Sequence, residues 1–277
     1  ACWRLVESSH GYSTDMAQPV APSDHMSTSA SFDVAVLGGG GAAEALVGAL
    51  SGSDRRVLVV EQERVGGTCP FVACMPSKAM LHDARGHTRW SDAVERRDEI
   101  VDHLDDLSHA HQLTHQGAHL IRGRARILDE HTIDVEGRSY HTEHLVIATG
   151  SMPLMPSIDG IDELGDLMWT SDDALTTTVR PVRLMVIGGG PIGSELAHLF
   201  AGFDTEVHLI DTAERAFPDL PVEIGEIVDS GLRSAAVRVY RGRSAVRFER
   251  RGGNVRTTLD NDTAVVTDRV VMAIGRS

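Results

Sequence analysis

Apolar runs and helical patterns alternate along this chain and form one complete unit near its start. The apolar run at 33–37 ends in glycines at 38–41, and a pattern rich in Ala and Leu at 42–50 predicts a helix. A second apolar run at 56–60 closes on the acid Glu61. Strand, glycine turn, helix and strand in this order predict a βαβ unit.

The same pattern restarts in the second half of the chain. An apolar run at 183–187 leads into glycines at 188–190 and a helical pattern at 194–200. A further apolar run at 206–210 ends at Asp211. The duplication predicts an α/β fold with two Rossmann-like dinucleotide-binding domains.

We assign one dinucleotide-binding domain to 31–155 and a second to 156–277. The polar residues 1–30, rich in Ser, Ala, Pro and Thr, predict a disordered tail. The other segments predict helices at 77–90 and 93–112, strands at 119–128, 132–135 and 145–150, a linker with a short helical piece at 151–181, and antiparallel strands between 237 and 274.

The charge balance limits the classes of partner. The 277 residues carry a formal net charge of -14, which argues against nucleic acids and anionic membrane surfaces, because these attract clustered Lys and Arg. No apolar run approaches the roughly 20 residues that span a bilayer. Residues 1–30 lack the basic start and apolar core of a secretory signal, so we expect a cytoplasmic protein.

The first glycine turn has the spacing of a dinucleotide fingerprint. Gly38 makes the tight turn, Gly40 lets a pyrophosphate approach the backbone, and the small Ala43 allows the helix to pack on the strand. Glu61 follows Gly38 by 23 positions, where a carboxylate accepts from ribose hydroxyls. A glycine-rich loop without a ligand is the alternative, but the strand, helix and acid together favour a nucleotide site.

The second fingerprint contains Gly188, Gly190 and Gly193, and its acid Asp211 again follows the first glycine by 23 positions. Asp211 favours NAD over NADP, since a carboxylate repels a 2′-phosphate. Arg215 offers the opposite interpretation, because a cation there can contact that phosphate. A solvated acid at the strand end is the third reading.

Two cysteines lie five positions apart between the fingerprints. Cys69 and Cys74 follow glycines that allow the backbone to approach a flat cofactor closely. The residues at 76–81, just after them, predict the start of a helix. A helix N-terminus lowers the pKa of a thiol, and Lys78 adds a cation one turn beyond Cys74. Two inert buried cysteines are the alternative. A single close pair in a cytoplasmic protein favours redox chemistry over a structural disulfide, and Cys2 in the tail receives no role.

The residues at 66–78, Gly-Gly-Thr-Cys-x4-Cys-x-Pro-Ser-Lys, are similar to the signature of the flavin-dependent pyridine nucleotide–disulfide oxidoreductases. That family includes dihydrolipoamide dehydrogenase, glutathione reductase, mycothione reductase and mercuric reductase. Segments 145–153 and 273–276 match further motifs of the family, and the resemblance covers 32–277.

This resemblance implies FAD in the first nucleotide site and NAD(P)H in the second. Cys74 would be the sulfur nearest the flavin, and Cys69 the interchange sulfur that attacks the substrate. Lys78 would pair with Glu195 beside the flavin. The resemblance also implies cofactor contacts at Gly67, Thr68, Gly123, Ala125, Thr149, Gly150 and Gly275.

The chain departs from the family pattern at several positions. Phe71 and Ala73 stand between the cysteines where relatives have Asn and Gly, and Pro191 replaces a bulkier residue over the nicotinamide pocket. The C-terminal flavin segment and the dimerisation domain, with its His-Glu acid–base pair, are absent from the sequence up to Ser277. We therefore expect an incomplete first domain, weak FAD binding, no full turnover by these residues alone, and a homodimer in the full-length form.

The leading interpretation is an FAD-dependent NAD(P)H:disulfide oxidoreductase acting on a small-molecule or protein-bound disulfide or dithiol. Two alternatives remain: the same fold with a mercuric ion or quinone as acceptor, and a truncated nucleotide-binding protein without turnover. The thioredoxin-reductase-like class is disfavoured, because its cysteines lie in the nicotinamide domain with two residues between them. The histidines at 103, 109, 111, 115 and 119 predict a solvated helix face and no metal site.

Overall fold

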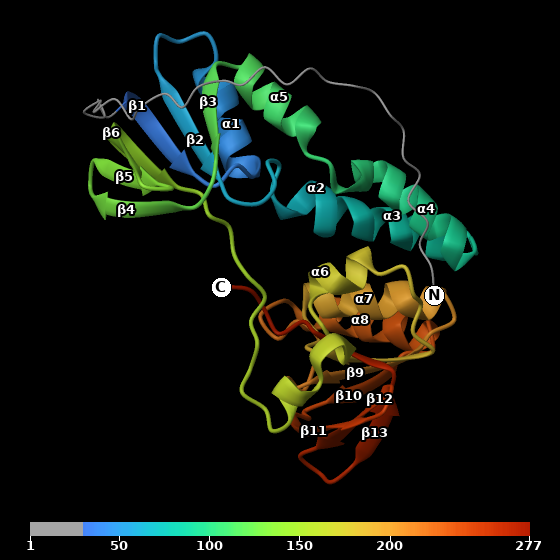
Figure 1. Ribbon diagram of the computed structural model, residues 1–277. Helices are drawn as coiled ribbons and strands as arrows, with labels where there is room; N and C mark the ends of the chain where they lie inside the picture. The colour runs from blue at the N-terminus through green and yellow to red at the C-terminus, as the bar shows by residue number, and fades with distance from the viewer. Residues whose placement is uncertain (1–29) are drawn as a thin grey trace, which may run out of the picture.

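The computed structural model describes residues 30–277. The predicted tail at 1–30 lies outside the described residues except for Ala30, which begins the first strand. Cys2 also lies outside them. Two units, each with its own sheets and helices, are joined by a long segment, and the C-terminus lies between them (Figure 1).

The first sheet has the strand order β3-β2-β1-β6-β5-β4. Strands β3, β2, β1 and β6 pair in parallel, whereas β4 and β5 extend β6 as an antiparallel meander. The bounds are β1 Ala30–Leu37, β2 Val57–Glu61, β3 Ala118–Arg122, β4 Ala125–Asp129, β5 Thr132–Val135 and β6 Arg138–Ile147.

Both faces of this sheet are buried. Alternate residues of β1 and β2, such as Val36 and Val59, pack against α1 (Gly41–Leu50) and α5 (Leu107–His115). The residues between them face the meander, where Ile133 is fully buried. A parallel sheet covered on both faces explains why these strands are continuous apolar runs in the sequence.

The second sheet is entirely parallel, in the order β10-β9-β8-β14-β7, and a three-stranded antiparallel sheet β11-β12-β13 packs on one of its faces. The strands are β7 Met168–Trp169, β8 Arg183–Ile187, β9 Glu206–Asp211, β10 Arg238–Arg241, β11 Ala245–Arg251, β12 Asn254–Leu259, β13 Ala264–Thr267 and β14 Arg269–Met272. The helices of this unit are α6 Ser171–Thr176, α7 Pro191–Gly202 and α8 Val222–Ser234.

The predicted duplication is confirmed down to the turn that ends each first strand. Gly38 and Gly188 have φ angles of 101° and 104°, a region that L side chains rarely adopt. A Cβ on Gly38 would lie 2.2 Å from the carbonyl oxygen of Ala148, and one on Gly188 would lie 2.4 Å from that of Ala273. Both positions therefore require glycine for conformation and for space, which confirms the two-Rossmann α/β fold class.

Three helices carry the cysteine segment towards the second unit: α2 Thr68–Val72, α3 Cys74–Arg85 and α4 Trp90–Ile100. Figure 1 shows α3 and α4 lying over α6 and α7. Met80 and Ala84 of α3 share one apolar core with Phe200 of α7. At their closest, a Cβ on Gly202 would lie only 2.8 Å from the Cβ of Ala84.

Several predicted elements were wrong in extent or pairing. The single helix predicted at 93–112 is two helices, because α4 ends at Ile100 and a 3-10 turn at Asp102–Leu104 separates it from α5. The strand predicted at 119–128 is interrupted at Gly123, whose φ of 153° breaks the extended backbone. Helix α8 was not predicted.

The pairing predicted for 237–274 is also corrected. Only β11, β12 and β13 are antiparallel, around the predicted turn at Gly252 and Gly253. Strands β10 and β14 join the parallel sheet instead. Their apolar residues pair with strands that are distant in sequence, which local patterns do not specify.

The first sheet has an open edge among the described residues. Strand β5 pairs with 138–141 of β6, whereas β1 pairs along β6 as far as Ile147. The last residues of β6 therefore have a strand partner on one side only, and the Ile147 side chain is exposed. The expectation of a missing closing strand stays a prediction. None of the helices between Ala30 and Ser277 combines the length and apolar character needed to cross a bilayer.

The close crossing of α3 and α7 gives a stability prediction. We expect Gly202→Ala to lower the free energy of unfolding by about 1–3 kcal/mol, because the new methyl group overlaps the buried Ala84 side chain where the two helices cross. Gly231→Ala in α8, where a Cβ meets nothing within 4 Å, is the matched control and should stabilise by about 0.5–1 kcal/mol. Urea unfolding measures both, and a stabilised Gly202→Ala variant would contradict the packing argument.

Candidate functional site

The first glycine loop presents unpaired amides at the start of α1. The N-cap residue Gly40 has no side-chain capping hydrogen bond, and a Cβ on Gly41 would meet nothing within 4 Å. No side chain caps the N–H groups of this first turn. A helix N-terminus of this kind binds phosphate groups through its amides and its dipole, so the residues present fit a dinucleotide.

Glu61 lies at the end of β2, directly beside this loop. Its Oε2 accepts a hydrogen bond from the Gly39 amide at 2.6 Å, and its Oε1 accepts one from the Glu63 amide at 2.6 Å. Backbone groups thus fix the carboxylate in place. Each oxygen retains a second lone pair for a ribose hydroxyl.

The cysteine segment packs directly on the first glycine loop. The Gly66 amide donates to the Gly39 carbonyl at 2.8 Å, and a Cβ on Gly67 would lie 3.0 Å from the Cα of Gly40. Gly67 has a φ of 73°, in the left-handed region. These contacts place Thr68, the first residue of α2, next to the predicted nucleotide site.

Cys69 and Cys74 are free and exposed thiols on two consecutive helices. Hydrogen bonding with Cys74 raises the pKa of the Cys69 thiol above its ordinary value, and partial burial adds to this, while the Lys78 ammonium acts in the opposite direction. The expectation that a helix N-terminus lowers the thiol pKa was therefore wrong for Cys69.

A cavity of about 370 Å³ lies where α3 meets the second unit. Cys74 and Lys78 line it from α3, and Glu195 lines it from α7. The Lys78 Nζ lies 2.5 Å from the Glu195 Oε1, so the implied pair is formed. Ser151, Ser171 and Arg276 also line this cavity, and the Arg276 guanidinium donates to the Ser151 carbonyl at 2.7 Å.

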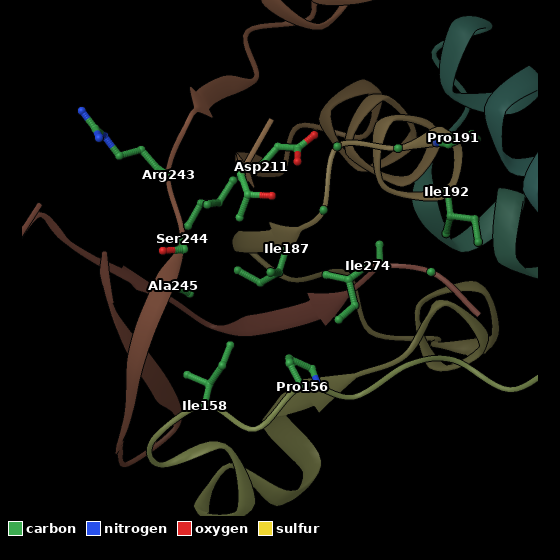
Figure 2. A pocket seen from close by; sticks show the side chains of 17 residues that line it. Pro156, Ile158, Ile187, Pro191, Ile192, Asp211, Arg243, Ser244, Ala245 and Ile274 are labelled. Atoms are coloured by element: carbon green, nitrogen blue, oxygen red, sulfur yellow. The ribbon is translucent and has the colours of Figure 1, made fainter. Parts of the chain in front are cut away.

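The second glycine loop lines a larger cavity of about 500 Å³ (Figure 2). Gly190 is the N-cap of α7, without a side-chain cap, and Pro191 occupies the first helical position. Gly193 needs its missing side chain, because a Cβ there would lie 1.8 Å from the Gly188 carbonyl oxygen. Gly275, from the end of the chain, lines the same cavity. The loop, the cavity and the amides fit a second dinucleotide.

Asp211 lines this cavity, and its carboxylate already has an ion-pair partner and a hydrogen-bond donor. Its Oδ2 lies 2.6 Å from the Arg241 Nη1, and its Oδ1 accepts from the Ala213 amide at 3.1 Å. Arg215 is occupied elsewhere, donating to the carbonyls of Phe217, Pro218 and Leu220. Sequence reasoning missed Arg241, because an arginine at a strand end resembles an ordinary solvated charge.

The other predicted cofactor residues lie around the first loop. Thr149 is next to it, since a Cβ on Gly38 would lie 3.1 Å from the Thr149 Cα, and Gly150 follows with open space around it. The Gly123 amide donates to the Glu61 carbonyl at 2.9 Å. Ala125 begins β4 and packs, partly buried, against the core under the meander.

The sequence predicted that His109 lies on a solvated helix face, and this prediction was wrong. The His109 Nδ1 lies 2.6 Å from the Glu44 Oε1 of α1, and its ring packs edge-on against the buried Phe71 at 5.4 Å. Phe71 of α2 thus packs against His109 of α5. Among residues 30–277, no three His, Cys, Asp or Glu side chains gather as metal ligands.

Comparison with known proteins agrees with this geometry. The profile described as pyridine nucleotide-disulphide oxidoreductase matches residues 32–277. A mercuric reductase of Staphylococcus aureus is 30% identical over 94% of this chain and 51% of its own length. A dihydrolipoyl dehydrogenase of Pseudomonas aeruginosa is 31% identical over 79% of this chain and 52% of its own.

A solved structure supports the same likeness. The Cu(II) complex of an HOCl-induced flavoprotein disulfide reductase from Escherichia coli has a TM-score of 0.83 and 28% identity, over 89% of this chain and 57% of that one. The chain thus spans about half the length of the relatives it matches.

The raised pKa of Cys69 makes a prediction for the reduced protein. Because the hydrogen bond with Cys74 is the main cause, Cys74→Ala should shift the pH midpoint of Cys69 alkylation downwards. Iodoacetamide rates between pH 6 and about 10, read by mass spectrometry in a Cys2→Ser background, measure this. Cys74→Ser keeps a hydroxyl partner and is the matched control. An unchanged midpoint in Cys74→Ala would contradict the assigned cause.

Proposed function

Because the chain belongs to the pyridine nucleotide-disulphide oxidoreductase family, we propose that it transfers electrons from NAD(P)H through FAD to the Cys69–Cys74 pair. The family uses FAD and NAD(P)H, and FAD would occupy the first glycine loop and the nicotinamide nucleotide the second. When bound, the flavin supplies two-electron exchange between nicotinamide and sulfur.

The single observation that carries this proposal is the Lys78–Glu195 pair in the shared cavity. It joins the helix that begins at Cys74 to the helix that begins at the second glycine loop. Lys78 is the only lysine in a chain whose Lys and Arg total 26. The single lysine side chain thus lies where α3 meets α7. An arginine there would present a planar fork in place of a compact ammonium.

The two cysteines have distinct surroundings that support distinct roles. Cys74 lines the cavity with Lys78 and Glu195, so it is the sulfur that receives electrons from the flavin side. Cys69 is exposed and is not among the residues lining that cavity. We assign Cys69 as the interchange sulfur that meets substrate.

Thiol–disulfide exchange then proceeds on this chain's own sulfurs. An electron pair cleaves the Cys69–Cys74 bond and leaves two sulfur groups that share the incoming proton. The Cys69 thiolate attacks a substrate disulfide, forming a mixed disulfide and releasing the first substrate thiol. Cys74 attacks the Cys69 sulfur, which restores the internal disulfide and releases the second substrate sulfur as a thiolate that takes its proton from water.

The acceptor and the assembly are further parts of the proposal. We favour a small-molecule or protein-bound disulfide in the cytoplasm as the acceptor, and a homodimer as the assembly of the full-length protein. The likeness to mercuric reductases favours Hg²⁺ as the second candidate acceptor.

The test is reduction of the internal disulfide. NADH or NADPH is added anaerobically to the oxidised chain with excess FAD. Alkylation then identifies which cysteines have become thiols. We expect Cys69 and Cys74 to become alkylated together. Lys78→Met or Glu195→Gln should slow this at least about tenfold, because each removes the ion pair that joins α3 to α7 beside the cavity.

The surface pair Arg250–Asp166, at 2.9 Å, gives the matched control. Arg250→Met removes an ion pair far from the cysteines and should leave the rate of thiol formation unchanged. Nucleotide binding without thiol formation would instead favour the non-catalytic nucleotide-binding protein. The rate at which an added acceptor reoxidises the thiols then identifies the acceptor class. The compounds to compare are oxidised glutathione, oxidised lipoamide, Hg²⁺ and a quinone.

A further inference from the structure

Arg241 forms a buried ion-pair network behind the second glycine loop. Its Nη1 lies 2.6 Å from the Asp211 Oδ2 on β9, and its Nη2 lies 2.7 Å from the Asp229 Oδ1 on α8. The three side chains are only 9%, 16% and 12% exposed. One guanidinium thus holds two carboxylates that are distant in sequence.

This guanidinium lies directly under the loop. A Cβ on Gly189 would lie 2.2 Å from the Arg241 Nη1 and 2.5 Å from the Asp211 Oδ2. The middle position of the loop therefore has no room for a side chain. The loop, the acid and the arginine form one packed unit at the floor of the cavity.

The two nucleotide sites anchor their acids in different ways. Glu61 in the first site is held by two backbone amides. Asp211 is one methylene shorter and is held by one amide and by Arg241. The second acid therefore depends on a side chain for its position, and that side chain can be changed without altering the loop backbone.

The remaining cations near this site are poorly placed for a phosphate on the ribose. Arg215 donates to three carbonyls of its own loop. Arg243 lines the cavity and is exposed, but Figure 2 shows its guanidinium turned away from the glycine loop. Arg241 itself is buried and shared by two carboxylates, so it cannot turn into the cavity.

We propose that Arg241 is a positioning residue that makes the second site select NADH over NADPH, by fixing Asp211 as the acceptor for the adenosine 2′-hydroxyl. The inference rests on the proposed function, which assigns this site to the nicotinamide nucleotide. A surface aspartate would rotate away from a 2′-phosphate at little cost. Rotation of Asp211 breaks a buried ion pair, so the carboxylate stays and excludes the phosphate.

The experiment measures binding of three probes by calorimetry to the chain saturated with FAD, so that the first nucleotide site is already filled: ADP, 2′-deoxy-ADP and adenosine 2′,5′-bisphosphate. In the unchanged chain we expect ADP to bind about tenfold or more tightly than 2′-deoxy-ADP, the effect of a hydrogen bond to a charged acceptor. The bisphosphate should bind more weakly than ADP. Tighter binding of the bisphosphate would overturn the proposal.

Arg241→Lys and Arg241→Gln test the arginine itself. Neither side chain reproduces the planar guanidinium fork, whose Nε, Nη1 and Nη2 all donate to the two carboxylates, so the preference for ADP over 2′-deoxy-ADP should fall to about twofold or less in both. The affinity for 2′-deoxy-ADP should be unchanged, which also reports that the site remains folded. A full preference for ADP in both variants would overturn the positioning role.

Arg238→Lys is the matched control, because Arg238 lies on the same strand and pairs with Glu206 at an exposed position. It should keep the preference of the unchanged chain. If none of the three probes binds to the unchanged chain, the nucleotide site and with it the proposed function fail. Binding of ADP with no preference over 2′-deoxy-ADP refutes the Arg241 inference alone.

Discussion

The close crossing of α3 and α7 is the contact on which the candidate site depends. Gly202 allows the backbone of α7 to approach Ala84, and the apolar core continues from one unit into the other at this point. Each of these helices begins at a chemical feature, Cys74 in one and the second glycine loop in the other. Packing the two helices together therefore brings Cys74 and the first turns of α7 to one cavity, where Lys78 pairs with Glu195.

The second constraint acts within each dinucleotide unit. A strand that ends in a positive-φ glycine must turn at once into a helix, and the neighbouring strand's carbonyl occupies the space of any side chain. The same geometry occurs at Gly38 and Gly188, so the duplication is one of backbone conformation. The side chains beneath the loops have diverged, since Glu61 is held by amides and Asp211 by a buried arginine.

Much of the fold was accessible from the sequence because it is encoded locally. Continuous apolar runs predicted the parallel strands, and the glycine spacing with an acid 23 positions later predicted both nucleotide loops. The predictions failed where pairing is long-range. Strand β14 looks like part of an antiparallel group but inserts beside β8, and α8 was missed although it supplies Asp229 to the second site.

The sequence by itself determined the candidate residues: two loops with the spacing of dinucleotide fingerprints, one cysteine pair, and a family likeness that named Lys78 and Glu195 as partners. Only the tertiary structure decided the electrostatics. Cys69 has a raised thiol pKa because another thiol is its hydrogen-bond partner, His109 is held by Glu44, and Asp211 is fixed by Arg241. The reason is physical, since spacing along a chain specifies backbone conformation, whereas the charge and mobility of a side chain depend on neighbours that only packing brings together.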